Sequence, residues 1–357
     1  MTVTRLTQKE DIIDYKPEDR KLKPPIFIVG CGRSGTTLLL NCLGRHKNIY
    51  AIKKETQLFV SYKTKSFLYF DKCEKEKDFE KLTLSILTQI FYGEDYTSKV
   101  LWKNQFPREI IKLFEEIKTE DGFKKLKNKY EIFDVCVKYL TSGEKKLRWV
   151  EKTPNNIFTT KLLLERYSKA KFVEIYRDPR AVWFSWLSAK FEYFKTSYLL
   201  ECIMVWRRTI NQGLGLVNEI PKQYFQVRYE DLINNPTEEI TKICNFINED
   251  FDPHMLNVEV VSNFFDDHKD FKGFSKTPLE RWEKMLSTNE LMFIDFLTKR
   301  QRKRLGYPDS NAKLMLVNLV PFFFFVLKKC IEARKQIKLF IKCRLRGFLN
   351  RLQKLKK

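Results

Sequence analysis

A glycine-rich loop between a short apolar run and a helical pattern is the feature that most constrains the fold of this chain. The run Pro25–Gly30 (PIFIVG) has the pattern of a buried strand, and the apolar residues Leu38–Leu40 open a helix. Between them, the segment Gly30–Thr37 reads GCGRSGTT. Such a turn presents several backbone N–H groups and the positive end of the helix dipole. The loop is therefore predicted to bind a phosphate group, the alternative being a tight turn without a ligand.

Short apolar runs alternate with helical patterns along the rest of the chain. Three further strands are predicted at Leu147–Glu151, Lys171–Tyr176 and Tyr224–Tyr229, and helices at Phe79–Tyr92, Arg108–Ile117 and Phe123–Leu140. This alternation predicts an α/β, P-loop-like three-layer fold with a central, mainly parallel sheet flanked by helices. Ligands bind such sheets beyond the C-terminal ends of the strands. We therefore expect the functional residues in the loops that follow the four strands.

The composition describes a folded and strongly basic protein. Of its 357 residues 43% are hydrophobic, which excludes wholesale disorder. The 67 Lys and Arg against 45 Asp and Glu give a net charge of +22, so nucleic acid, a membrane surface and a phosphate-bearing ligand are all possible partners. We expect a polar arm over residues 1–23, one folded domain over 24–310 and a separate tail over 311–357.

The cysteines and the N-terminus predict a cytoplasmic protein without a metal site. The eight Cys include no CxxC pair and there are only three His, so zinc-ligand spacing is absent. Most of the Cys lie in apolar segments, where a buried thiol is ordinary. The first 20 residues, MTVTRLTQKEDIIDYKPEDR, lack the apolar stretch of a signal peptide.

The loop departs from the Walker motif GxxxxGK[ST] at the residue that contacts the β- and γ-phosphates. Thr36 stands where the Walker lysine would be, and the basic residue Arg33 lies inside the loop instead. This departure counts against a P-loop nucleotide kinase or NTPase, which stays an alternative. A second alternative is a catalytically inactive membrane-binding adaptor, which the net charge would support.

The loop resembles the 5′-phosphosulfate loop of sulfotransferases that use 3′-phosphoadenosine 5′-phosphosulfate (PAPS). In that family a Lys or Arg precedes Ser-Gly-Thr-Thr, as Arg33 precedes Ser34–Thr37 here. The resemblance implies that the donor is bound by Gly32, Arg33, Ser34, Gly35, Thr36 and Thr37. After the third strand, Arg177 and Ser185 match the family's 3′-phosphate motif of an Arg and a Ser eight residues apart. A guanidinium and a hydroxyl together suit a phosphate.

Three other segments extend the resemblance, which spans residues 24–307. Lys152 follows the second strand in an EKTP segment, which is similar to the EKSP-type segments of the carbohydrate-acting branch, where the Lys neutralises the transferring group. Glu55 matches the Glu that the carbohydrate and tyrosyl-protein branches use as base. In YEDL, which resembles a segment found across the family, Tyr229 is expected at the adenosine, whereas Glu230 and Asp231 either act there or only tie down the loop.

A fourth segment, residues 271–282, falls where the family has a loop that covers the cofactor. Ser275, Lys276 and Arg281 are candidates there for binding the 3′-phosphate.

The resemblance implies transfer of a sulfuryl group from PAPS to a hydroxyl or amine of a carbohydrate, lipid-linked glycan or protein. Glu55 would deprotonate the acceptor, while Lys152 and Arg33 would neutralise the transferring group. No metal is implied. The identity of the acceptor cannot be read from the residues.

The tail differs from the rest of the chain in charge and in the spacing of its apolar residues. Residues 311–357 contain 13 Lys or Arg and one acidic residue, Glu332, and so carry +12 of the net charge. Their apolar run Leu314–Leu327 has 14 residues, shorter than the ~20 that span a bilayer. Apolar residues then recur at spacings of three and four among basic ones, at Ile337, Ile341, Leu345, Phe348, Leu352 and Leu355. The pattern predicts an amphipathic helix on an anionic membrane surface, or alternatively one packed on the body; nucleic acid is not expected as a partner.

Overall fold

The computed structural model describes residues 22–60, 76–93, 96–97, 100, 105–119, 126, 128–188, 199–258, 274–310, 327 and 331. Nearly all of the expected N-terminal arm and of the expected tail lie outside these residues. The expectations for the arm and the tail therefore stay predictions.

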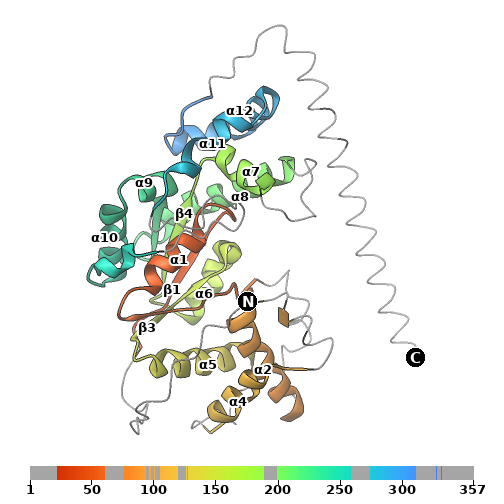
Figure 1. Cartoon of the computed structure of the whole chain (residues 1–357), viewed down its shortest axis with the longest axis vertical. Helices are drawn as coiled ribbons and strands as arrows, with labels where there is room; N and C mark the ends of the chain where they lie inside the picture. The colour runs from red at the N-terminus through yellow and green to blue at the C-terminus, as the bar shows by residue number, and fades with distance from the viewer. Residues whose placement is uncertain are drawn as a thin grey trace.

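A five-stranded parallel sheet forms the centre of the molecule (Figure 1). Its strands are β1 (Ile26–Gly30), β2 (Ile49–Ala51), β3 (Arg148–Lys152), β4 (Lys171–Tyr176) and β5 (Tyr224–Arg228), in the order β2-β3-β1-β4-β5. The chain leaves β1 toward one side of the sheet, returns through β3 and continues on the other side. This reversal places β1 at the switch point, where the C-terminal ends of parallel strands leave room for a ligand.

The helices have the following bounds. They are α1 (Thr36–Gly44), α2 (Glu76–Tyr92), α4 (Arg108–Ile117), α5 (Lys129–Gly143), the 3-10 helix η2 (Pro154–Thr159), α6 (Thr160–Arg166), α7 (Pro179–Ser188), α8 (Leu199–Glu219), α9 (Tyr229–Asn234), α10 (Pro236–Ile247), the 3-10 helix η4 (Pro253–Leu256), α11 (Thr277–Met285) and α12 (Thr288–Arg304).

The predicted α/β class with a central parallel sheet is confirmed, and the sequence-based bounds of several elements differ from the structure by one to six residues. Two of these differences have a physical cause that the contacts show. The helix predicted from Phe123 begins at Lys129, because the Asn128 side chain accepts hydrogen bonds from the N–H groups of Tyr130 and Glu131 and caps it there. The last predicted strand ends one residue early, because Tyr229 already opens α9.

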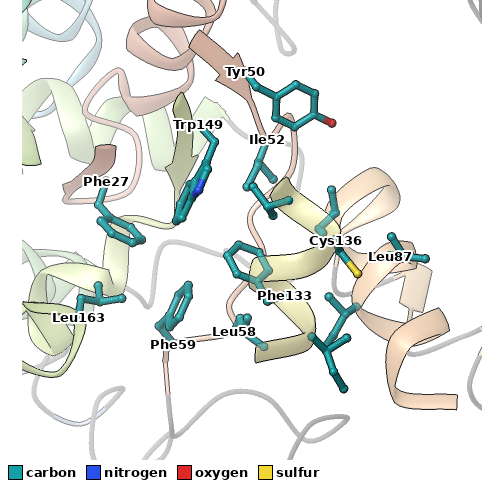
Figure 2. Close-up of a cluster of buried hydrophobic side chains, with 14 of the residues drawn as sticks. Phe27, Tyr50, Ile52, Leu58, Phe59, Leu87, Phe133, Cys136, Trp149 and Leu163 are labelled. Carbon is teal, nitrogen blue, oxygen red and sulfur yellow. The ribbon is translucent and has the colours of Figure 1, made fainter. Parts of the chain in front are cut away.

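Alternate residues of β1 point to opposite faces of the sheet, and helices cover both. Phe27 and Val29 belong to a cluster that also contains residues of α2, α5 and α6. Figure 2 shows Phe27, Trp149 and Phe133 gathered in this cluster, with the Phe27 and Trp149 ring centroids 5.4 Å apart and edge to face. A strand buried on both faces has the near-continuous apolar sequence seen in PIFIVG.

Ile26 and Ile28 of β1 point to the other face, where they pack with residues of α1, α9 and α10. A third cluster joins α7, α8, α11 and α12, and Figure 1 shows α11 and α12 at the end of the molecule opposite to α2, α4 and α5. The five cysteines in the described ranges are buried and form no disulfide, as expected from their apolar surroundings.

Candidate functional site

The loop between β1 and α1 needs glycine at two positions. Gly35 has a φ of 100°, and a Cβ there would lie 2.4 Å from Cδ2 of Tyr229. Gly30 has a φ of 139°, and a Cβ there would lie 2.5 Å from the carbonyl oxygen of Ile175. The loop therefore folds tightly onto the ends of β4 and β5. Arg33 has a φ of 71°, a left-handed conformation that is strained for a side chain of this size.

The first turn of α1 has the properties of an anion-binding site. Gly35 occupies its N-cap position, no side chain caps the helix, and its first turn holds no acidic residue. Ser34 is fully buried, and among the described residues its hydroxyl has no hydrogen-bond partner. Helix N–H groups and a buried hydroxyl at one point fit a phosphate or sulfate group. The residues present thus suit the donor that the sequence implies.

Arg33 and Arg177 bring two positive charges together beside this turn. An Nη1 N–H of Arg177 donates to the backbone oxygen of Arg33 at 3.4 Å, and Nε of Arg33 donates to Oγ of Ser185 at 3.1 Å. Burial, and next the charge of Arg177, lower the pKa of Arg33. Because the half-buried Arg33 and the buried Arg177 carry like charges that repel each other, a bound anion would stabilise the arrangement.

The structure thus joins the two phosphate motifs that the sequence separates by more than 140 residues. Ser185 contacts Arg33 of the first loop, while the Arg177 guanidinium lies 4.2 Å from the ring centroid of Tyr229. All four residues therefore surround one small region next to α1.

A set of buried contacts holds the loop after β4 in place. Asp178 accepts a hydrogen bond from the N–H of Arg180 at 2.8 Å and caps α7, and its own N–H donates to Glu230 at 3.1 Å. The second oxygen of Glu230 accepts from the Tyr307 hydroxyl at 2.8 Å. Trp206 donates to the backbone oxygen of Arg177 at 2.9 Å. Of the two roles open for Glu230, the contacts therefore favour the one that ties down the loop.

Lys152 and Glu55 form an ion pair at the end of β3. Nζ of Lys152 and Oε1 of Glu55 are 2.6 Å apart, and their side chains are 7% and 38% exposed, respectively. The other carboxylate oxygen of Glu55 accepts from the Gln57 side chain at 2.9 Å. The segment after Lys152 starts the 3-10 helix η2, with Pro154 in its first turn. The arrangement offers a buried cation and a half-exposed carboxylate side by side.

The segment 271–282 lies only partly within the described residues. Phe271–Gly273 are outside them. Lys276 is exposed and directly precedes α11, while Ser275 and Arg281 are half-buried. These three residues stay candidates.

Sequence reasoning missed the buried carboxylate of Glu151, which lies beside the Lys152–Glu55 pair. It accepts hydrogen bonds from the side chains of Thr56, which follows Glu55, and of Thr153, which follows Lys152. The signal in the sequence was a charged residue that ends an apolar strand directly before the candidate lysine. A charge in such a place is rarely buried unless it has several hydrogen-bond partners.

Two further properties concern the described ranges alone. They contain no group of three His, Cys, Asp or Glu side chains arranged to hold a metal ion. They also contain no helix that is both long and apolar enough to cross a membrane.

Comparisons with known proteins point to one family. The model of the sulfotransferase family matches residues 24–253, which include β1 to β5. A Caenorhabditis briggsae protein with the name "putative protein-tyrosine sulfotransferase" is 28% identical over 203 residues, or 51% of this chain and 71% of that protein. The omega-hydroxy-beta-dihydromenaquinone-9 sulfotransferase of Mycobacterium tuberculosis is 26% identical over 135 residues, or 34% of this chain and 33% of that protein.

Solved structures agree on the fold. The sulfotransferase domain of the Synechococcus PCC 7002 olefin synthase superposes with a TM-score of 0.53 at 19% identity, over 82% of this chain and 98% of that domain. The family match extends over more than half of the chain and includes both the loop between β1 and α1 and the Lys152 segment. The chain therefore belongs to the sulfotransferase family.

Proposed function

We propose that this sulfotransferase takes its sulfuryl group from PAPS and transfers it to a hydroxyl group of the acceptor. The observation that carries the proposal is the Lys152–Glu55 pair, 2.6 Å apart, at the same edge of the sheet as the uncapped N-terminus of α1. A cation and a base beside an anion-binding helix end are the groups that this transfer requires.

The donor site of this proposal combines the two phosphate motifs. The loop Gly32–Thr37 and the first N–H groups of α1 would hold the 5′-phosphosulfate. Arg177 and Ser185 would hold the 3′-phosphate, and Tyr229 would contact the adenosine. Three observations support this assignment: the closeness of Arg33 to Arg177, the buried hydroxyl of Ser34 and the lack of a side-chain cap on α1. Bound PAPS supplies an activated sulfuryl group whose leaving group is adenosine 3′,5′-bisphosphate.

Glu55 and Lys152 divide the chemistry between them in this proposal. The carboxylate of Glu55 takes the proton of the acceptor hydroxyl, and the ammonium of Lys152, with the Arg33 guanidinium, balances the negative charge that develops during transfer. Because Glu55 is 38% exposed and Lys152 only 7%, the acceptor reaches the pair from the side of Glu55. The ion pair also holds the base in one orientation before the substrates bind.

A hydroxyl is the acceptor group that the relatives favour. One group of them is named for protein tyrosine and the other for an omega-hydroxy menaquinone, and both names specify a hydroxyl. The half-exposed Glu55 carboxylate can accept a proton from either kind of group.

The test is transfer of label from [³⁵S]PAPS to a panel that includes a tyrosine-containing peptide, a long-chain alcohol and a carbohydrate. We expect the wild type to label at least one acceptor, and we expect Glu55→Gln to lose that labelling while it still binds adenosine 3′,5′-bisphosphate. Full labelling by Glu55→Gln would overturn the assigned base. Failure of the wild type to bind the bisphosphate would overturn the donor.

For residues 311–357 we propose attachment to an anionic membrane surface. The support is in the sequence: 13 basic residues against one acidic residue, with apolar residues at helical spacing. Each basic residue near such a surface contributes about 1 kcal/mol to binding.

A further inference from the structure

The candidate base lies on a short segment without regular secondary structure that is fastened to the end of β3. Between β2 and α2, Thr56 donates its N–H to Oε1 of Glu151 at 3.2 Å and its hydroxyl to the same oxygen at 3.0 Å. The next N–H, that of Gln57, donates to Oγ1 of Thr153 at 3.2 Å. The side-chain amide of Gln89 in α2 donates to the backbone oxygen of Thr56. Glu55 is therefore followed directly by two residues with fixed backbones.

Glu151 is the centre of these contacts. Its carboxylate is fully buried, and four donors point to it: the N–H and the hydroxyl of Thr56, the hydroxyl of Thr153 at 2.5 Å and the amide of Asn156 at 2.8 Å. So many donors on two oxygens fit an ionised carboxylate. Burial raises the pKa of Glu151 to about 6, hydrogen bonds from Thr153 and Thr56 lower it, and the charge of Glu55 raises it. The group is therefore ionised at neutral pH.

The position of Glu151 connects both members of the ion pair. It directly precedes Lys152 in β3, so the two side chains leave the strand on opposite faces. Its partner Thr56 directly follows Glu55. One buried carboxylate thus accepts hydrogen bonds from the residue that follows each member of the Lys152–Glu55 pair: from the backbone and hydroxyl of Thr56 and from the hydroxyl of Thr153.

The same segment contains backbone strain. Gln57 has a φ of 52°, a left-handed conformation that a residue with a side chain rarely adopts. Its amide N–H is held by Thr153, and its side chain donates to Glu55 at 2.9 Å. Strain of this kind persists only where surrounding contacts enforce it. Here those contacts converge on Glu151.

We propose that Glu151 is a positioning residue for sulfuryl transfer: through Thr56 and Thr153 it holds Glu55 in the orientation in which it meets Lys152. The proposal rests on the proposed function of Glu55 and Lys152. It predicts that loss of the Glu151 carboxylate slows transfer without weakening the binding of the donor, because misplacing a reacting group by about 1 Å can lower the rate about 100-fold.

The experiment uses the full chain with two substitutions at Glu151 and the same two at Glu174. Glu174 is a matched control, because it is also a fully buried carboxylate, lies on β4 and accepts from Tyr224 at 2.9 Å. For each protein, transfer from labelled PAPS to a tyrosine-containing peptide and to water, the dissociation constant of adenosine 3′,5′-bisphosphate and the melting temperature are measured.

We expect Glu151→Met to lower kcat about 100-fold while the dissociation constant of the bisphosphate changes less than about threefold. Glu151→Gln should recover most of this loss, since its amide oxygen still accepts from Thr56 and its amide nitrogen faces Asn156. Among the described residues the side-chain oxygen of Asn156 is buried without a hydrogen-bond partner, so it can accept from that nitrogen. Glu174→Met and Glu174→Gln should keep the kcat of the wild type per folded molecule.

Crystal structures of the folded variants give a readout that needs no turnover. In Glu151→Met we expect Glu55 and Lys152 to be more than 4 Å apart. A Glu151→Met variant that retains the ion pair, or that has the kcat of the wild type, overturns the positioning role. If Glu151→Met does not fold, Thr56→Val, which removes one donor and keeps the shape, replaces it in both measurements. Full activity of Glu55→Gln would instead overturn the proposed function. If the wild type is active, Glu55→Gln is inactive and Glu151→Met is fully active, only the positioning role of Glu151 is overturned.

Discussion

Gly35 illustrates how single residues determine the conformation of the loop between β1 and α1. Its φ of 100° and the 2.4 Å that would separate a Cβ at this position from the Tyr229 ring exclude any side chain there, whereas a Cβ on Gly32 would meet nothing within 4 Å. Two glycines three residues apart in one loop therefore have different reasons to be present. A side chain at Gly35 would clash with the Tyr229 ring, whereas a side chain at Gly32 would extend into open space beside the loop.

This difference gives the first prediction. Gly35→Ala should lower the melting temperature by several degrees, since strain and a clash of this kind typically destabilise by about 1–3 kcal/mol. Gly32→Ala should change it by less than about 1–2 °C, because surface substitutions away from such features stay near 0.5 kcal/mol. Calorimetric melting of both variants makes the comparison. Equal melting temperatures would show that the loop is not folded as described.

The second prediction concerns Glu55. Glu55→Gln keeps the size of the side chain and removes its basicity, so kcat should fall about 10²–10⁴-fold, the range for a lost general base. The dissociation constant of adenosine 3′,5′-bisphosphate should stay within about threefold of the wild-type value if Glu55 acts only on the acceptor. Steady-state kinetics and calorimetry measure the two quantities. A weaker bisphosphate complex with unchanged kcat would place Glu55 in the donor site instead.

Several residues of the candidate site could be predicted from the sequence, and their contacts could not. The basic residues Arg33, Lys152 and Arg177 follow apolar runs, and parallel strands bring such positions to one edge. The hydrogen bond between Arg33 and Ser185 depends on how α7 leaves the sheet, which no local pattern encodes. Glu151 was missed because its partners Thr56 and Asn156 come from separate segments.

At the scale of elements, strands β3 and β4 each bring one buried carboxylate to the same face of the sheet. Glu151 is aligned with Phe27 of β1, and Glu174 with Val29. Glu174 accepts from Tyr224 at 2.9 Å and from Gln226 at 2.6 Å, and burial raises its pKa to about 7 despite these two bonds. Strand β4 thus contains a carboxyl group, that of Glu174, whose ionisation near neutral pH destabilises the fold.

The third prediction follows from the sign of this shift. Because the folded-state pKa of about 7 lies above the ordinary 4.5, protonated Glu174 supports the fold fully below pH 4.5 and the support is lost as the pH rises through 7. Over this range the wild type should lose about 3 kcal/mol of unfolding free energy relative to Glu174→Gln, since one pKa unit corresponds to about 1.4 kcal/mol. Urea unfolding of both proteins at pH 5 and pH 8 measures the difference. If the unfolding free energies of the wild type and Glu174→Gln change equally between pH 5 and pH 8, the predicted effect of Glu174 is ruled out.

The elements themselves were largely predictable, and the exceptions have physical causes. Strands β1, β3, β4 and β5 have five or six residues, and the pattern detects the apolar residues within them. Strand β2 has three residues, too few for any periodicity, and it exists because Tyr50 and its neighbours pair with β3. The segment after Lys152 forms a 3-10 helix before α6, a distinction that Thr153 and Pro154 alone do not encode.

At the scale of the whole molecule, the excess of positive charge divides between two regions. The net charge is +22 and residues 311–357 carry +12 of it, which leaves +10 for residues 1–310. In the body, Arg33, Lys152 and Arg177 lie at the edge of the sheet where the parallel strands end. The proposed anionic donor would account for these charges, and an anionic membrane surface is proposed for those of the tail.

The fourth prediction tests the tail. The shortened chain should end after Ser310, since Arg302 and Arg180 donate to the backbone oxygen of Pro308 at 2.6 and 3.0 Å, and Asp295 accepts from the N–H of Ser310. The full chain should float with vesicles that contain anionic lipid and release them at high salt, because screening weakens surface electrostatics. The shortened chain should stay in the soluble fraction. Equal recovery of both with vesicles would contradict the proposal.

The most direct test of the central claim is calorimetric titration of the protein with adenosine 3′,5′-bisphosphate. The wild type and Arg304→Ala, which alters an exposed arginine at the end of α12, should bind one equivalent with similar affinity. Arg177→Ala should bind about 10- to 100-fold more weakly, since a hydrogen bond to a charged group contributes about 1.5–3 kcal/mol. Absence of binding by the wild type, or equal binding by Arg177→Ala, would contradict the assignment of this edge of the sheet as the donor site.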